Sequence, residues 1–185
     1  DAQESGEFFL EKFPNSEHVE PIVLAMANIY ENLAHYKKAA DLYSNFAEKY
    51  TKSDKRADAY YNAALYYESV GNKDKAVSHY EKYIRLFEKR DDTPKVYLKL
   101  AGLFDEASNY KTASTMYGEF SKKFAKQASE ADIVFSKFRF AEIKLKEKKY
   151  PEAEKVFKEI AVDFVKYKEP TKKDPRVQYA GAYSL

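Results

Sequence analysis

Residues 58–83 read DAYYNAALYYESVGNKDKAVSHYEKY, and their spacing of small and aromatic residues decides the fold class. On both sides of the turn Gly71-Asn72, apolar residues recur at intervals of three and four, so each set forms one stripe along a helix. The two stripes are Tyr60, Ala63, Ala64 and Tyr67, then Ala76, Tyr80 and Tyr83. Small side chains at Ala64 and Ala76 would let the helices approach closely at the turn. The stretch therefore predicts a helical hairpin.

The same hairpin recurs along the whole chain. Ala39, Ala76 and Ala113 are each 37 residues apart, and Ala153 follows after 40. A second ladder of bulky pairs keeps this register: Phe9/Phe13, Phe46/Tyr50, Tyr83/Phe87, Phe120/Phe124 and Ile160/Phe164. Self-similarity at a fixed period is the signature of a repeat architecture, so we predict an array of hairpins.

Composition narrows the function classes. Hydrophobic residues make up 44% of the chain and charged residues 34%, but the net charge is only +2, which argues against nucleic acid as the partner. The chain has no cysteine, so disulfides and thiolate metal sites are excluded. The longest apolar run, residues 22–27, is far shorter than the roughly 18 residues of a membrane span. We predict no direct membrane span.

The register also predicts the boundaries of the repeats. We expect single repeats at 18–53, 54–91, 92–127 and 128–168, with helices over about 19–33 and 36–50 in the first of them. Residues 7–16 match the second helix of a preceding repeat, and 173–185 match the start of a further one. Asp92-Thr93-Pro94 predicts a helix start capped by the Thr93 hydroxyl. Because both ends fall inside repeats, we expect the chain to be a fragment of a longer solenoid.

These hairpins resemble the tetratricopeptide repeat (TPR). The small site of the family's first helix matches Ala27, Ala64, Ala101 and Ala141, whereas its turn glycine is present only as Gly71. The resemblance implies an all-α fold, an α–α superhelix of antiparallel hairpins that forms one TPR array over residues 1–185. The junction phrases FLEKFPNS (9–16) and FAEKYTKS (46–53) resemble those of bacterial periplasmic and outer-membrane-lipoprotein arrays, and such arrays also occur in gliding-motility complexes. We therefore expect a location in the periplasm or at the periplasmic face of the outer membrane, with the cytoplasm as the alternative.

Residues that could carry catalysis are sparse. His18, His35 and His79 lack metal-ligand spacing and are expected at the surface or in turns, and the carboxylates of Asp105-Glu106 are expected on solvent-facing positions. The chain has no glycine-rich phosphate loop and no nucleophile motif. We predict that the protein is not an enzyme and holds neither cofactor nor metal.

The resemblance implies a protein-interaction scaffold whose concave groove, lined by the first helix of each repeat, binds a protein or peptide. Asparagines on this face would bond the partner's backbone, and Tyr61 or Phe138 would offer apolar anchors. The predicted groove residues are Leu24, Asn28, Tyr61, Asn62, Leu65, Lys95, Leu98, Lys99, Phe138, Arg139 and Glu142. The sequence leaves the identity of the partner and the oligomeric state open.

A sharper alternative is a cytosolic adaptor that captures peptide C-termini. Asn28, Asn62, Lys95 and Lys99 stand where chaperone-binding family members clamp a terminal carboxylate. However, Leu24 replaces the first lysine of that clamp, and Lys99 replaces an arginine. The alternative is therefore a partial carboxylate clamp.

Overall fold

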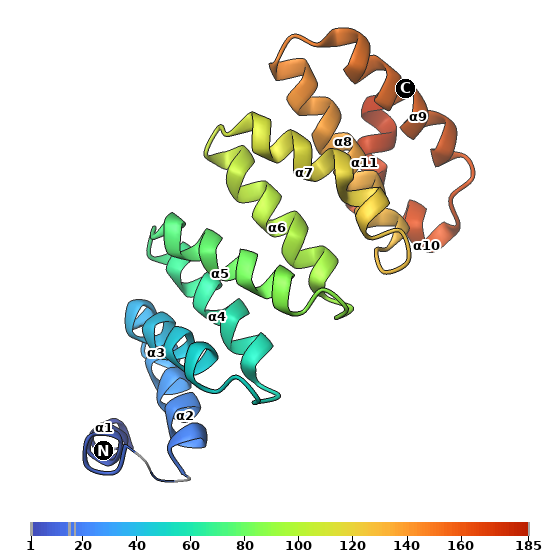
Figure 1. The fold of residues 1–185 in the computed structure, drawn as a ribbon. Helices are drawn as coiled ribbons and strands as arrows, with labels where there is room; N and C mark the ends of the chain where they lie inside the picture. The colour runs from blue at the N-terminus through green and yellow to red at the C-terminus, as the bar shows by residue number, and fades with distance from the viewer. Residues whose placement is uncertain (1, 15, 17, 185) are drawn as a thin grey trace. The chain divides into compact units, whose positions relative to one another are not determined.

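The computed structural model describes residues 2–14, 16 and 18–184, and helices supply all the regular secondary structure in this part of the chain (Figure 1). Asn15, which belongs to the predicted junction at 9–16, lies outside the described residues. The helices are α1 (Ala2–Lys12), α2 (Val19–Asn32), α3 (Tyr36–Lys49), α4 (Arg56–Ser69), α5 (Lys73–Leu86), α6 (Thr93–Glu106), α7 (Tyr110–Lys123), α8 (Glu130–Lys146), α9 (Tyr150–Phe164), α10 (Glu169–Lys172) and α11 (Pro175–Ser184). The all-α prediction is confirmed, and α2 and α3 end within one residue of the predicted bounds.

The helices fall into two compact units, Asp1–Glu88 with α1 to α5 and Lys89–Leu185 with α6 to α11. Each unit is a stack of antiparallel hairpins of the TPR solenoid type. The segment between α9 and α11 contains the four-residue helix α10. The predicted cap of α6 is wrong, because α6 begins at Thr93 and Asp92 therefore occupies the N-cap position. The Asp92 side chain forms no capping hydrogen bond, and Thr93 is fully buried.

One turn geometry closes all four hairpins. Ala34, Gly71, Ser108 and Lys148 adopt φ values of 56°, 76°, 58° and 60°, which lie in the left-handed region. Around Gly71, its amide donates to the carbonyl of Glu68 at 2.9 Å and the next amide donates to Tyr67 at 2.8 Å, which satisfies carbonyls at the helix end. The same pair of bonds forms around the other three residues. The repeat therefore imposes the left-handed conformation at all four positions, although glycine is the only one of these residue types that favours it.

The predicted small-residue sites form the helix contacts of the first unit. Ala27, Ala39, Ala64 and Ala76 are all fully buried, as the hairpin pattern requires. The rings of Phe46, Tyr80 and Tyr83 fill the spaces beside them. Burying a large apolar side chain stabilises a fold by about 1.5–3 kcal/mol, so these rings supply much of the unit's stability.

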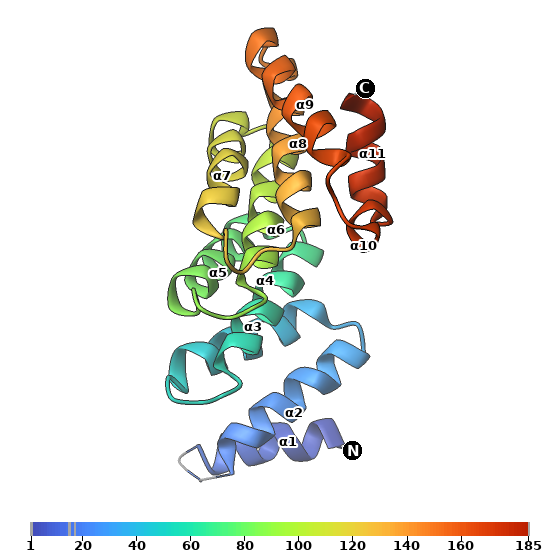
Figure 2. The ribbon, with the colours of Figure 1, turned by 90° about the vertical axis from the view of Figure 1, so that its right-hand side faces the viewer.

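The second unit has its last core where α11 packs beside α8 and α9 (Figure 2). Phe138 lies in this core: its ring is 3% exposed and makes edge contacts with Phe157, Tyr179 and Tyr183 at 5.4–5.7 Å. The expectation that Phe138 offers an accessible anchor is therefore wrong, because a helix from the segment after the fourth repeat helps to cover it. Asp132 of α8 is also buried, and its carboxylate accepts a 2.8 Å bond from Arg176 of α11.

Candidate functional site

The hydroxyl of Tyr43 lies at the centre of a polar cluster in the first unit. From α3 it reaches α2, where it lies 2.5 Å from Asn28 Oδ1 and 3.0 Å from Glu31 Oε2. The side chain of Asn62 on α4 also interacts with this hydroxyl and acts to lower the pKa of Tyr43. Burial, followed by the hydrogen bond to the Glu31 carboxylate, raises the pKa of Tyr43 well above its ordinary value. Tyr43 therefore remains a neutral donor that ties α2 to α3.

Two further tyrosines extend this cluster. The ring of Tyr66 on α4 stacks on Tyr36 with centroids 5.5 Å apart and an interplanar angle of 4°, and on Tyr43 at 6.0 Å and 14°. Burial and a hydrogen bond to Glu31 raise the pKa of Tyr66 as well. Tyr36 is 39% exposed, so this stack ends in an accessible aromatic face.

We name the surface around this cluster the α2–α4 face. It consists of Leu24, Asn28, Glu31, Asn62, Leu65 and Tyr66. Asn28 is exposed, and the other five side chains are half-buried. The face offers amides that can bond a peptide backbone, beside leucines that can contact apolar side chains. Four of the predicted groove residues, Leu24, Asn28, Asn62 and Leu65, belong to it.

Tyr61 is placed differently from its predicted role as an anchor. Its ring makes edge contacts with Tyr80 at 6.0 Å and Tyr83 at 6.4 Å, so it packs on buried rings of α5. The side chain is half-buried. Only part of this ring is available to a partner.

In the second unit, α6 carries three of the predicted groove residues. Lys95 is exposed and Lys99 is half-buried, and their spacing of four places them on one side of α6. Leu98 is buried at 7% exposure, so the expectation that it is accessible is wrong. The reason is that α6 has buried residues on several sides and therefore exposes only a narrow strip.

Arg139 and Glu142 of α8 form an ion-pair network around a buried acid. Arg139 bonds to Asp105 of α6 at 2.5 Å and to Glu142 at 2.7 Å, and Lys146 bonds to the same Asp105 at 3.2 Å. Burial lowers the pKa of Arg139, but Glu142 and Asp105 more than offset this effect, so its pKa is raised. Asp105 is 5% exposed, so the expected solvent-facing position is wrong. This network joins α6 to α8. Arg139 and Glu142, both predicted groove residues, therefore form ion pairs within the protein.

The proposed clamp residues divide between the units. Asn28 and Asn62 lie in the first unit, whereas Lys95 and Lys99 lie in the second. The Oδ1 atom of Asn28 already lies 2.5 Å from the Tyr43 hydroxyl. The partial carboxylate clamp stays a prediction.

His79 is the histidine that departs from expectation. His18 and His35 are exposed next to helix starts, but His79 is 6% exposed inside the first unit. In the part of the chain that the structure describes, no group of three or more acidic or histidine side chains could hold a metal ion. Nor does any helix among the described residues have the length and apolar character needed to cross a membrane.

Solved structures with the same fold are TPR proteins. A kinesin light chain protein with nearly identical TPR-like repeats from Podosopora anserina shares 13% identity and a TM-score of 0.63, covering 100% of this chain and 85% of that one. A TPR protein from Parabacteroides merdae shares 15% identity and a TM-score of 0.63, with coverage of 98% and 64%. MamA shares 18% identity and a TM-score of 0.62, with coverage of 90% and 84%. Among curated proteins, no sequence matches the chain.

A family model places the chain more specifically. The model described as "Soluble NSF attachment protein, SNAP" matches residues 3–169. The matched span includes α2 to α9, and therefore all four hairpins that carry the repeat register. Family and fold are of the TPR-like scaffold type, which is generally non-catalytic. The chain belongs to the soluble NSF attachment protein (SNAP) family.

Proposed function

We propose that the chain is a non-catalytic scaffold that binds a protein or peptide segment on the first helices of its repeats. The observation that carries this proposal is the α2–α4 face, where the Tyr43 hydroxyl lies 2.5 Å from Oδ1 of Asn28 and also interacts with Asn62. Amides that are fixed before binding lose little conformational entropy when they bond a peptide backbone. The first unit therefore presents a preorganised polar pair beside Leu24 and Leu65.

The second unit, taken by itself, presents positive charge. Lys95 and Lys99 lie along α6, so a segment bound to this unit would gain from acidic side chains or from a terminal carboxylate. Phe138 takes no part, since its ring belongs to the core. Arg139 and Glu142 support the unit through Asp105 in this proposal.

A selection experiment tests the proposal. Random peptides displayed on phage are selected on the wild-type chain, and the affinity of the recovered peptides is measured by fluorescence anisotropy. We expect Asn28→Ala/Asn62→Ala to weaken binding by at least about tenfold, because two hydrogen bonds of roughly 1 kcal/mol each are lost. Asn45→Ala, at an exposed asparagine of α3 outside the face, is the matched control and should bind normally.

The outcomes separate the alternatives. Recovery of no peptide, or equal affinity of the double variant and wild type with unchanged circular dichroism, would overturn the proposal. A strict requirement for a free peptide C-terminus, lost in Lys95→Ala/Lys99→Ala, would favour capture of C-termini by the partial clamp instead.

We also propose that the protein acts in a bacterial envelope or gliding-motility complex, in the periplasm or at the periplasmic face of the outer membrane. The support is the likeness of residues 9–16 and 46–53 to the junctions of envelope TPR arrays. Fractionation of cells that express the tagged protein, with immunodetection in periplasmic, membrane and cytoplasmic fractions, tests this location. Recovery in the cytoplasmic fraction alone would contradict it.

A further inference from the structure

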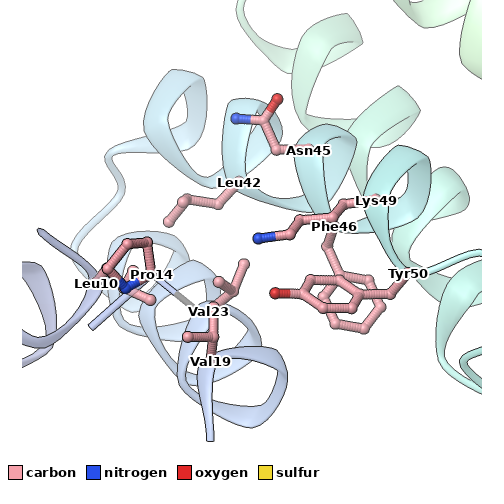
Figure 3. Close-up of a pocket in the computed structure, with 9 residues that line it drawn as sticks. All are labelled: Leu10, Pro14, Val19, Val23, Leu42, Asn45, Phe46, Lys49 and Tyr50. Carbon is pink, nitrogen blue, oxygen red and sulfur yellow. The ribbon is translucent and has the colours of Figure 1, made fainter. Parts of the chain in front are cut away.

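A pocket of about 220 Å³ lies between α1, α2 and α3 in the first unit (Figure 3). Its apolar walls are Leu10 of α1, Val19 and Val23 of α2, and Leu42 and Phe46 of α3. None of these residues belongs to the α2–α4 face. The pocket is therefore a second feature of the unit and does not depend on the function proposed above.

Tyr50 places a polar atom against these walls. Its hydroxyl is buried and has no hydrogen-bond partner among the described residues. Buried polar groups are nearly always paired in folded proteins, because an unpaired one retains the full cost of losing water. A buried hydroxyl that no described protein group satisfies needs an explanation.

The repeat register shows that the fold does not require this hydroxyl. The equivalent positions in the other repeats hold phenylalanine: Phe13, Phe87, Phe124 and Phe164. Tyr50 packs on Phe46 with centroids 4.8 Å apart, much as Phe87 packs on Tyr83 at 5.4 Å. The ring of Tyr50 therefore provides the packing that phenylalanine provides in the other repeats. Its hydroxyl is present in this repeat alone among the five positions compared, and it lies at the pocket.

Lys49 adds a cation to the same pocket. Its Nζ atom lies 5.4 Å from the centroid of the Tyr50 ring. Figure 3 shows this amine and the Tyr50 hydroxyl both directed into the pocket, whereas the amide of Asn45 points away. Within the described residues Lys49 forms no ion pair. A hydroxyl donor and an ammonium donor thus converge over apolar walls.

We propose that this pocket binds a ligand with a short apolar body and a carboxylate head. The carboxylate would accept from the Tyr50 hydroxyl and from Lys49, and such charge-assisted bonds are stronger than neutral ones. The apolar body would lie against Val23 and Leu42. A volume of about 220 Å³ lies below the roughly 300–1,000 Å³ of sites for drug-sized ligands, which suits a short body of about six carbons. Free aliphatic acids and the C-terminal residue of a polypeptide share this chemistry.

Hexanoate is the probe that tests the site. Its binding to the 185-residue chain is measured by isothermal titration and by NMR shifts of the Val19, Val23 and Leu42 methyl groups. We expect Tyr50→Phe, which restores the residue of the other repeats, to weaken binding by about tenfold, and Lys49→Gln to do the same. Lys123→Gln is the matched control, because Lys123 is the equivalent residue beside Phe124 in the second unit. This control should bind hexanoate as the wild type does.

Two further ligands complete the test. Hexanol should bind at least tenfold more weakly than hexanoate, because it cannot pair with Lys49. The peptide Gly-Gly-Leu distinguishes a polypeptide C-terminus from a free aliphatic acid, and its C-terminal amide shows whether the carboxylate is needed. Tighter binding of the peptide than of hexanoate identifies a polypeptide C-terminus as the ligand. Weaker binding of the peptide identifies a free acid. Absence of hexanoate and peptide binding at millimolar concentration, equal binding of hexanol, or unchanged affinity in Tyr50→Phe would each overturn the proposal.

Discussion

The hydroxyl of Tyr80 donates a 3.0 Å hydrogen bond to Oε2 of Glu68, and Tyr43 stands in the same relation to Glu31, also at 3.0 Å. Each bond runs from the second helix of a hairpin back to the end of its first helix, so it locks the two helices together near the turn. Burial raises the pKa of the Tyr80 hydroxyl far above its ordinary value, and the charge of Glu68 raises it further, so Tyr80 stays a donor. The pair is a repeated internal brace of the first unit.

Two substitutions at Tyr80 separate the ring from its hydroxyl. The ring is fully buried, so Tyr80→Ala should lower the free energy of unfolding by about 3–5 kcal/mol. Tyr80→Phe keeps the ring and loses the bond to Glu68, so we expect a loss of about 1 kcal/mol. Urea unfolding followed by circular dichroism measures both values. A Tyr80→Ala variant as stable as wild type would contradict the burial of the Tyr80 ring in the core.

The left-handed turn residues offer the next prediction. A residue with a Cβ atom costs roughly 1–2 kcal/mol in this conformation, and glycine escapes that cost. Ser108→Gly and Lys148→Gly should therefore each raise the free energy of unfolding by about 0.5–1 kcal/mol, after the entropy of glycine in the unfolded chain is subtracted. Gly71→Ala should lower it by about 1 kcal/mol. Thermal and urea unfolding test the three signs together, and a destabilised Ser108→Gly would contradict the turn geometry.

Two helical glycines should respond differently to alanine. A Cβ atom added at Gly102 meets only the Tyr117 hydroxyl at 3.8 Å, so Gly102→Ala should gain about 1 kcal/mol of stability from helix propensity. At Gly118 the added atom lies 3.0 Å from the ring of Phe140, and this contact should leave Gly118→Ala at least about 1 kcal/mol less stable than Gly102→Ala. Phe140→Leu removes the obstructing ring, so Gly118→Ala measured in that background should recover the gain. Equal effects of the two alanines would exclude a close helix contact at Gly118.

The spacing of alanines and rings was sufficient to predict the hairpins, because helix stripes and turns are local properties of the sequence. The position of Asp105 was not predictable in this way. Its burial depends on Arg139, which lies 34 residues further along the chain and belongs to another hairpin. The predicted accessibility of Phe138 is wrong for a related reason, because α11, which lies outside the repeat pattern, helps to cover its ring.

Other features could have been found by aligning the repeats. Ala34, Ser108 and Lys148 align with Gly71, and that alignment alone indicates a left-handed turn at residues whose types do not favour one. Likewise, Tyr50 is the tyrosine in a ladder that otherwise holds phenylalanine at that position. In both cases the signal lies in the comparison of one repeat with the next, and a single repeat does not show it.

His79 has a titratable ring inside the first unit. Its Nδ1 lies 2.8 Å from the carbonyl oxygen of Lys75, and its Nε2 lies 2.8 Å from the hydroxyl of Ser44. A carbonyl can only accept, so Nδ1 carries the hydrogen and Nε2 accepts from Ser44 in the neutral ring. Burial lowers the pKa of His79 below its ordinary value of 6.5, and this effect outweighs the hydrogen bond to the Lys75 carbonyl, which acts to raise it. The charge of Lys82 lowers the pKa further, and that of Glu48 raises it.

The fold should therefore lose stability in mild acid through this residue. In the unfolded chain His79 takes up a proton near pH 6.5, whereas in the folded chain it stays neutral to lower pH, so the unfolded state binds more protons between the two values. The contribution is present above pH 6.5 and is lost as the pH falls through the lower folded pKa, with a slope of at most about 1.4 kcal/mol per pH unit. Urea unfolding at pH 7.5 and 5.5 measures this loss above the range where carboxylates of ordinary pKa titrate. His79→Gln removes the titrating ring, so its stability should change less between these two pH values. If wild type and His79→Gln lost the same stability, the ring would be as easily protonated in the folded protein as in the unfolded chain. That result would contradict the effect of burial on His79.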